Sequence, residues 1–325
     1  MTVFIIRRLL QAALVVLLMS LIVFFGVNVI GDPVDMLINP EADQAEIERT
    51  IRALGLDRPI GEQYLFFLKG ISSGDFGRSF IFGEPALKLI LQHMPATMEL
   101  ALAALFMAIL IGIPLGLFAG LYPDNPVSRG IMAGSILGFS LPTFWVGLMM
   151  MMVFAVYLGW LPSTGRGDTL VFLGFESSAF TRDGLSHLAM PALNLALLKI
   201  SLVIRLTRAG AREALHQDYI KFARAKGLSI RRVIGVHLLK NIMIPVVTVL
   251  GLEFGNLLAF SVVTESIFAW PGMGKLLIES LLQLDRPVVV AYLMIIVALF
   301  VVINLIVDIV YSILDPRVRL RDQGT

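Results

Sequence analysis

The sequence predicts an all-α membrane protein with six transmembrane helices. Of its 325 residues, 57% are hydrophobic and only 15% are charged, whereas a soluble domain is nearer half apolar and a quarter charged. The apolar residues are also gathered in long runs. A spanning helix needs about 20 of them, because the hydrocarbon core of a bilayer is about 30 Å thick. Six runs reach this length, at approximately 9–30, 97–121, 131–160, 189–207, 245–267 and 288–311.

The first run follows Arg7 and Arg8 and superficially resembles a signal peptide. It is too long for the apolar part of such a peptide, and residues 28–33 contain no small-residue cleavage pattern. We therefore expect an uncleaved first span. The third run contains Gly138 and Pro142, so we expect a kinked helix with one end outside the bilayer.

The distribution of charge predicts the orientation. Between residues 205 and 240 there are nine basic and two acidic residues, whereas residues 31–95 carry ten acids and six bases. Basic loops face the cytoplasm. We expect segment 205–240 on that side, and residues 31–95 with the loops near 161–187 and 268–287 on the other. An even number of spans then places both termini in the cytoplasm.

Three regions follow from this topology: an N-terminal helix at 1–30, an extracytoplasmic segment at 31–95, and a transmembrane domain at 96–325 with a cytoplasmic loop at 208–243. Within the second region, Asn39 and Pro40 predict a helix start and Gly55 its end. There is no internal repeat of the kind common in secondary transporters.

A short amphipathic helix is predicted in the cytoplasmic loop. Tyr219, Phe222, Ala223 and Lys226 recur at helical spacing and form one stripe, and Gly227 suits a C-terminal stop. Such a stripe must be buried on the membrane surface, on the chain's own bundle or in a groove of another protein.

A second short helix is expected after this glycine. Ser229 suits its N-cap, and the helix would run from Ile230 to Leu239. Pro245 would then mark the start of the fifth span.

The segment "DYIKFARAKGLSIRRVIGVHLLKNIMIP" resembles the cytoplasmic coupling loop of inner-membrane permease subunits of ABC importers, in their dipeptide, oligopeptide and nickel branch. The general importer signature begins Glu-Ala-Ala, where this chain has Lys221-Phe222-Ala223, and the distance from Gly227 to Pro245 is similar to that of the peptide branch. Other matching segments occur in the expected order: "LGLDRPIGEQYLFFL", "GDFGRS", "MPATMELAL", "GFSLPTFWVGL", "LGWLPSTG", "TESIFAWPGMGKLL" and "LDPRVRL".

The resemblance implies a transporter subunit of a prokaryotic cytoplasmic membrane, with no catalytic residues of its own. Implied partners are a homologous sister permease, two cytoplasmic ATP-binding subunits that hold ATP and Mg, and an extracytoplasmic substrate-binding protein. Cofactors, metals and nucleic acid are not expected on this chain. Dipeptides or oligopeptides are the expected substrates and import the expected direction; the alternatives are nickel, glutathione or an opine in the same family, or an ion-coupled secondary transporter.

In such permeases the cytoplasmic helix sits in a groove of the ATPase and moves with it. The resemblance carries this role to eight positions here: Asp218, Tyr219, Phe222, Ala223, Arg224, Ala225, Lys226 and Gly227. The small alanines would permit close approach, the aromatic rings would fill the groove, and the glycine would let the chain turn back.

Enzymatic motifs are absent from the sequence. "PGMGKLL" is not a phosphate-binding loop, because the required first glycine is Ala269 and the Ser/Thr after the lysine is Leu276. The four histidines have no metal-ligand spacing, and the chain has no cysteine.

Two charged residues are expected at membrane depth, Lys199 in the fourth span and Glu253 in the fifth. Each costs about 2.5–3.5 kcal/mol on insertion scales, so each is a functional candidate. Three interpretations stay open: an ion pair between them, a pathway lining that meets the termini of a zwitterionic substrate, or a contact with the sister permease.

Other polar or bending positions are candidates for the pathway. In "SLPTFW", Pro142 bends the chain beside Phe144 and Trp145, with Ser140 available to satisfy a freed carbonyl; the bend is either purely structural or part of a gate. Interhelical hydrogen bonding is the expected role of Glu99, Asn194, Asn256 and Glu265, and Asn256 is also a pathway candidate.

Overall fold

The computed structural model describes residues 2–29, 52, 57–172 and 174–314. The helix expected between Asn39 and Gly55 and residues 315–325 therefore lie outside the described residues. The chain forms two compact units: unit 1 comprises Met1–Met94 with Lys275–Val301, and unit 2 comprises Pro95–Gly274 with Val302–Thr325.

Unit 1 is built from α1 (Thr2–Val29), α4 (Ile60–Ser72), the first turns of α5 (Ala86–Leu121), most of α12 (Met273–Leu282) and the first half of α13 (Arg286–Leu314). Val23 of α1 packs with Val290 and Met294 of α13. Ser20 of α1 shares a 2.8 Å hydrogen bond with the hydroxyl of Tyr64 on α4. Unit 1 thus has its own small apolar core.

Unit 2 is organised around α8 (Arg182–Leu215), the most buried of the long apolar helices. α11 (Leu239–Ile267) and α6 (Pro126–Ser140) pack along it, and α7 (Thr143–Met150) packs beside it. The other elements are η1 (Met151–Tyr157), β1 (Leu170–Phe172), β2 (Phe175–Ser177), α9 (Asp218–Ala225), α10 (Ile230–Arg232) and η2 (Val233–Leu238).

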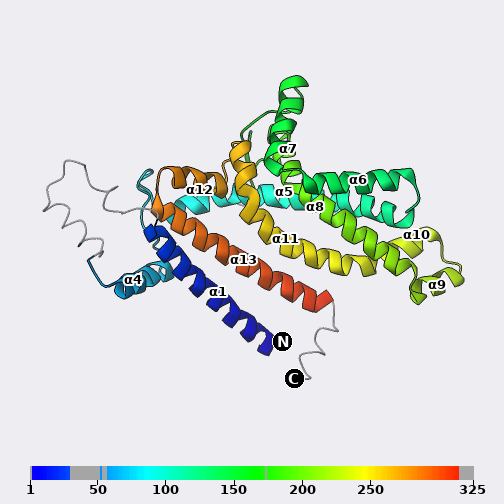
Figure 1. The fold of residues 1–325 in the computed structure, drawn as a ribbon, viewed down its shortest axis with the longest axis horizontal. Coiled ribbons are helices and arrows are strands. Elements are labelled where there is room, and N and C mark those ends of the chain that lie inside the picture. Colours follow the sequence, from blue (N-terminus) through cyan, green and yellow to red (C-terminus); the bar gives the residue numbers. More distant parts are fainter. Residues whose placement is uncertain (1, 30–51, 53–56, 173, 315–325) are drawn as a thin grey trace. The chain divides into compact units, whose positions relative to one another are not determined.

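The described chain has five helices long and apolar enough to cross a membrane, and a sixth span if the α6–α7/η1 pair is counted as one. This confirms an all-α membrane protein. The expected kink in the third span is a larger break: Leu141 and Pro142 are both extended, and the chain bends by 107° between the two arms (Figure 1). Pro142 therefore ends one helix and precedes the next.

A row of three glycines sets the contact between α5 and α8. Gly112, Gly116 and Gly120 are spaced four residues apart on α5. A Cβ built on Gly116 would lie 2.6 Å from the carbonyl oxygen of Ile204, and one on Gly112 would lie 2.7 Å from the Cβ of Val203. Small residues at this spacing let membrane helices approach closely, so the row allows α5 to lie directly on the backbone of α8.

Two predicted boundaries are wrong. The helix expected at 230–239 does not end before the fifth span, because α10, η2 and α11 form one helix from Ile230 to Ile267 with Pro245 inside it. A widened π turn at Val233–Leu238 precedes the proline. The sequence also gave no sign of the antiparallel hairpin β1–β2.

Candidate functional site

The predicted amphipathic helix forms as α9, Asp218–Ala225. Gly227 follows it with φ +74°, a left-handed conformation that glycine adopts without strain, and its amide donates to the carbonyl of Arg224 at 2.9 Å. Ser229 stands at the next N-cap position, but its side chain makes no capping hydrogen bond. The predicted helix before Gly227 and the turn at this glycine are therefore confirmed.

The two faces of α9 are divided differently from the prediction. Ile220 is fully buried and Ala223 is 4% exposed, because this face packs on η2 and α8. Tyr219 and Phe222 are 38% and 61% exposed. The expectation that Ala223 provides close approach to a partner is wrong, since this alanine lets α9 approach its own bundle.

The uncovered face of α9 is aromatic and basic. Lys226 Nζ lies 4.5 Å from the ring centroid of Phe222, and Lys221 pairs with Asp218 at 2.9 Å. Arg224 and Ala225 are exposed as well. Exposed aromatic rings with adjacent cations are typical of surfaces that bind another protein.

Lys199 and Glu253 form an ion pair between α8 and α11. Lys199 stands in the middle of α8, 17 residues after Arg182 and 16 before Leu215. Glu253 is 14 residues from either end of α11. The first of the three interpretations is thus the arrangement in the structure. Pairing lowers the cost of placing either charge at membrane depth.

This pair is not sealed inside unit 2, since the side chains of Lys199 and Glu253 keep 17% and 21% of their exposure. Asn256 lies one turn further along the same face of α11 and is partly exposed. Its side chain has no hydrogen-bonding partner among the described residues, so the expected interhelical bond is not made. Asn194 does make one, to Thr264 of α11 at 3.2 Å.

Among the described residues, no hydrogen bond or ion pair joins the break in the third span to Lys199 or Glu253. Ser140 donates to the carbonyl of Ile136 at 2.9 Å, which is within its own helix. Phe144 and Trp145 are 53% and 45% exposed. Pro142 separates the two arms. The predicted bend is confirmed, but Ser140 does not satisfy the carbonyl that Pro142 frees, which is that of Gly138. A role in gating stays a prediction.

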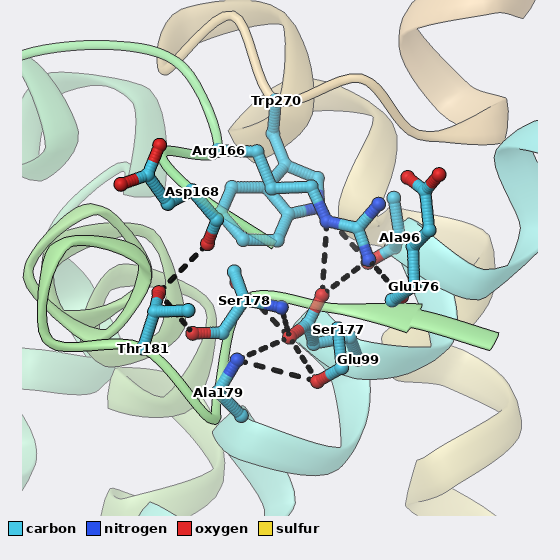
Figure 2. Close-up of polar contacts among 10 residues, drawn as sticks. All are labelled: Ala96, Glu99, Arg166, Asp168, Glu176, Ser177, Ser178, Ala179, Thr181 and Trp270. Carbon is cyan, nitrogen blue, oxygen red and sulfur yellow. Dashed lines mark hydrogen bonds and ion pairs between the residues drawn. The ribbon is translucent and has the colours of Figure 1, made fainter. Parts of the chain in front are cut away.

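A second polar site lies at the end of unit 2 opposite α9, around Glu99 of α5. We call Glu99, Arg166, Ser177, Ser178 and Ala179 the Glu99 cluster. One carboxylate oxygen accepts from Arg166 Nε at 3.0 Å and Nη2 at 2.6 Å. The other accepts from the hydroxyls of Ser177 and Ser178 and from the amides of Ser178 and Ala179, at 2.7–2.9 Å. Figure 2 shows these donors converging on Glu99.

The partners of Glu99 are in the connection between η1 and α8, and not on another helix as expected. Arg166 Nη2 also donates to the carbonyl of Glu176 at 2.7 Å, and the guanidinium lies 5.8 Å from the ring centroid of Trp270. Thr181 donates to the carbonyl of Asp168 at 2.7 Å. The Glu99 cluster therefore fastens the hairpin-bearing loop to α5.

The neighbouring network explains the "PGMGK" glycines. Fully buried Glu265 accepts from Thr97 at 2.8 Å and from the amide of Gly274 at 2.7 Å, and Met273 donates its amide to Thr97 at 2.8 Å. These two side chains thus satisfy the first amides of α12. A Cβ on Gly272 would lie 2.4 Å from the Glu265 carboxyl carbon, so the glycine makes room for a carboxylate and not for a phosphate.

Comparison with protein families identifies the chain. Residues 112–320 match the family described as binding-protein-dependent transport system inner membrane component, and residues 1–101 match its N-terminal counterpart. The chain belongs to this family. It is accordingly an ABC-transporter permease, a multi-pass protein of the bacterial inner membrane and a transport subunit.

Relatives of the permease align over almost the whole chain. It is 38% identical over 319 residues to the di/tripeptide transport system permease protein DppB of Pseudomonas aeruginosa, which covers 91% of this chain and 95% of that protein. It is 39% identical over 321 residues to the oligopeptide transport system permease protein AppB of Bacillus subtilis, covering 98% and 100%. Identity to the dipeptide transport system permease protein DppB of Escherichia coli is 36% over 333 residues, covering 97% and 98%.

The fold of the permease also resembles a solved structure. A chain of the MetNI methionine ABC transporter in an inward-facing conformation superimposes with a TM-score of 0.53 over 70% of this chain and 96% of that chain. Because the two are only 16% identical, the likeness concerns the fold alone.

The sequence indicated most of the candidate positions of the permease but not all of the contacts between them. It identified α9, Gly227 and the two intramembrane charges. It did not connect Glu99 with Arg166, which is 67 residues later. The spacing of Gly112, Gly116 and Gly120 was a signal that could have indicated the α5–α8 contact.

Proposed function

We propose that this permease is the membrane-spanning subunit of an ATP-driven importer for dipeptides or oligopeptides. The observation that carries the proposal is the near full-length similarity, at 36–39% identity, to three proteins named as dipeptide, tripeptide or oligopeptide transport permeases.

The proposed complex contains a homologous sister permease, two cytoplasmic ATP-binding subunits and an extracytoplasmic substrate-binding protein. ATP and Mg bind on the partner subunits. Membership of the binding-protein-dependent family supports such an assembly. The large apolar side chains left exposed on α6, α7 and η1, including Phe139, Val156 and Tyr157, support a chain surrounded by lipid and another membrane subunit.

The proposed orientation places α9 and both termini in the cytoplasm. The excess of basic residues between Arg205 and Lys240 supports it. α9 then serves as the coupling helix: Tyr219 and Phe222 enter a groove of the ATP-binding subunit, while Ile220 and Ala223 transmit its movement to η2 and α8. In such coupling the helix bundle has two conformations, and both ATP on the partner subunits and substrate in the pathway shift the equilibrium between them.

The test is uptake by the assembled complex. The permease is purified with its co-assembled subunits through an affinity tag and reconstituted in vesicles with the substrate-binding protein. Uptake of radiolabelled dialanine, trialanine, pentaalanine, glutathione, an opine and nickel is then measured with and without Mg-ATP. We expect Mg-ATP-dependent uptake of at least one of the alanine peptides.

Two results would overturn the proposal. Uptake of nickel, an opine or glutathione with no uptake of any alanine peptide would replace the substrate class. Uptake driven by an ion gradient without ATP-binding subunits would replace the transport mechanism with that of a secondary transporter.

A further inference from the structure

The uncovered intramembrane ion pair is the feature of the permease that the family assignment leaves unexplained. Lys199 and Glu253 pair across α8 and α11, yet both side chains stay partly exposed at the middle of their helices. A pair that served only to join two helices would be most stable with both charges fully enclosed, because lipid cannot solvate the exposed part. The exposed side of the pair therefore faces water, a ligand or another subunit in the assembled transporter, and the polar groups around it favour a ligand.

Asn256 is a second, independent polar group on the same face. It follows Glu253 by three residues, which places both on one side of α11. Its amide has one acceptor and two donors, and none is used by a described residue. An unused amide beside an exposed ion pair, at membrane depth, is a hydrogen-bonding site without its partner.

The chemistry of this trio matches a molecule with one positive and one negative end. We propose that Lys199, Glu253 and Asn256 form a binding site for the two charged termini of a short peptide within the translocation pathway. Lys199 binds the terminal carboxylate, Glu253 binds the terminal ammonium, and Asn256 hydrogen-bonds the peptide group between them. This inference rests on the proposed function and adds the part of the substrate that this chain recognises.

Exchange of partners makes the binding electrostatically neutral. In the free permease one ion pair is present, between Lys199 and Glu253. When a zwitterion enters, that pair opens and two new pairs form, so no charge is left alone in a low-dielectric region at the end of the step. When the site is empty, Lys199 and Glu253 neutralise each other. The site binds only the peptide's termini and not its side chains, which suits a transporter that accepts many sequences.

Comparing the maximal uptake of three variants tests the site. Dialanine uptake is measured at saturating binding protein and ATP for Lys199→Met, Glu253→Gln and the double variant. Each single change removes one charged contact, and we expect it to lower maximal uptake by about 10- to 100-fold. The double variant loses both contacts and is expected to be lower still. Lys88→Met is the control, because it removes a cation from an exposed pair with Glu84, and its uptake should equal wild type.

Terminally blocked peptides give a second readout. Lys199→Met should reduce uptake of N-acetyl-dialanine, which keeps its carboxylate, more than uptake of dialanine amide. Glu253→Gln should show the reverse preference. If each variant lowers uptake of the two blocked peptides by the same factor relative to wild type, the proposal is overturned. If the wild type carries neither blocked peptide, the dialanine measurements alone decide.

Structural roles give different results. If the pair only joins helices, the double variant recovers above either single variant, because no unpaired charge is left. If it binds the sister permease, the single variants lose that subunit on co-purification while the Lys88→Met control retains it. Either result overturns the proposal. A wild-type complex that takes up no peptide would instead refute the proposed function, so the two failures are distinguishable.

Discussion

Replacing Glu99 by glutamine tests how the loop that carries β1 and β2 is held to the bundle. The carboxylate of Glu99 accepts six hydrogen bonds, two from Arg166 and four from residues 177–179. A carboxamide has one acceptor oxygen, so its nitrogen must face one of the two donor groups. With the oxygen kept toward the serines, the nitrogen faces Arg166, and both charged bonds are lost.

The magnitude follows from burial and from the number of bonds lost. The side chains of Glu99 and Arg166 are only 8% and 12% exposed. Each hydrogen bond to a charged group contributes about 1.5–3 kcal/mol, and breaking a buried pair by removing one partner costs about 3–5 kcal/mol. We therefore expect Glu99→Gln to lower the free energy of unfolding by about 3–5 kcal/mol.

Unfolding of the purified permease in mixed detergent micelles, followed by tryptophan fluorescence, measures this change. Trp270 is a suitable reporter, because its ring lies beside Arg166 and its Nε1 donates to the carbonyl of Ala96 at 2.8 Å. Glu84→Gln is the matched control: its pair with Lys88 is exposed and worth about 1 kcal/mol or less. An effect of Glu99→Gln no larger than that of the control would refute the reasoning.

Three further predictions concern glycines and a buried hydroxyl. Gly116→Ala should destabilise the permease by about 1–3 kcal/mol through overpacking on α8, whereas Gly134→Ala, whose added Cβ meets nothing within 4 Å, should leave detergent unfolding unchanged or slightly raise stability. Gly227→Pro should leave the protein inserted but abolish ATP-dependent uptake, because proline cannot adopt φ +74° or donate to Arg224; Gly227→Asn should retain uptake, and normal uptake by the proline variant would contradict the coupling role. Thr97→Val should lower the free energy of unfolding by about 1–3 kcal/mol, because it removes the hydroxyl that accepts from the Met273 amide and donates to Glu265. An unchanged unfolding curve would show that water replaces the hydroxyl.

The sequence by itself determined the class of protein, the spans and the position of α9. A transmembrane helix is a local property, because about 20 consecutive apolar residues suffice to cross a bilayer whatever surrounds them. The stop at Gly227 is equally local, since only its own backbone must adopt a positive φ. The same reasoning failed at Pro245, where the helix continues through the proline after a π turn at Val233–Leu238.

Only the tertiary structure decided which polar groups meet. Glu99 and Ser178 are 79 residues apart, and Lys199 and Glu253 are 54 apart. Whether such residues touch depends on how each helix is rotated about its axis and how closely it approaches its neighbour. Those variables are set by the summed packing of many side chains, such as the glycine row of α5 against α8. The same rotation buried Ala223 and turned Phe222 outward, which no periodicity in eight residues could have distinguished.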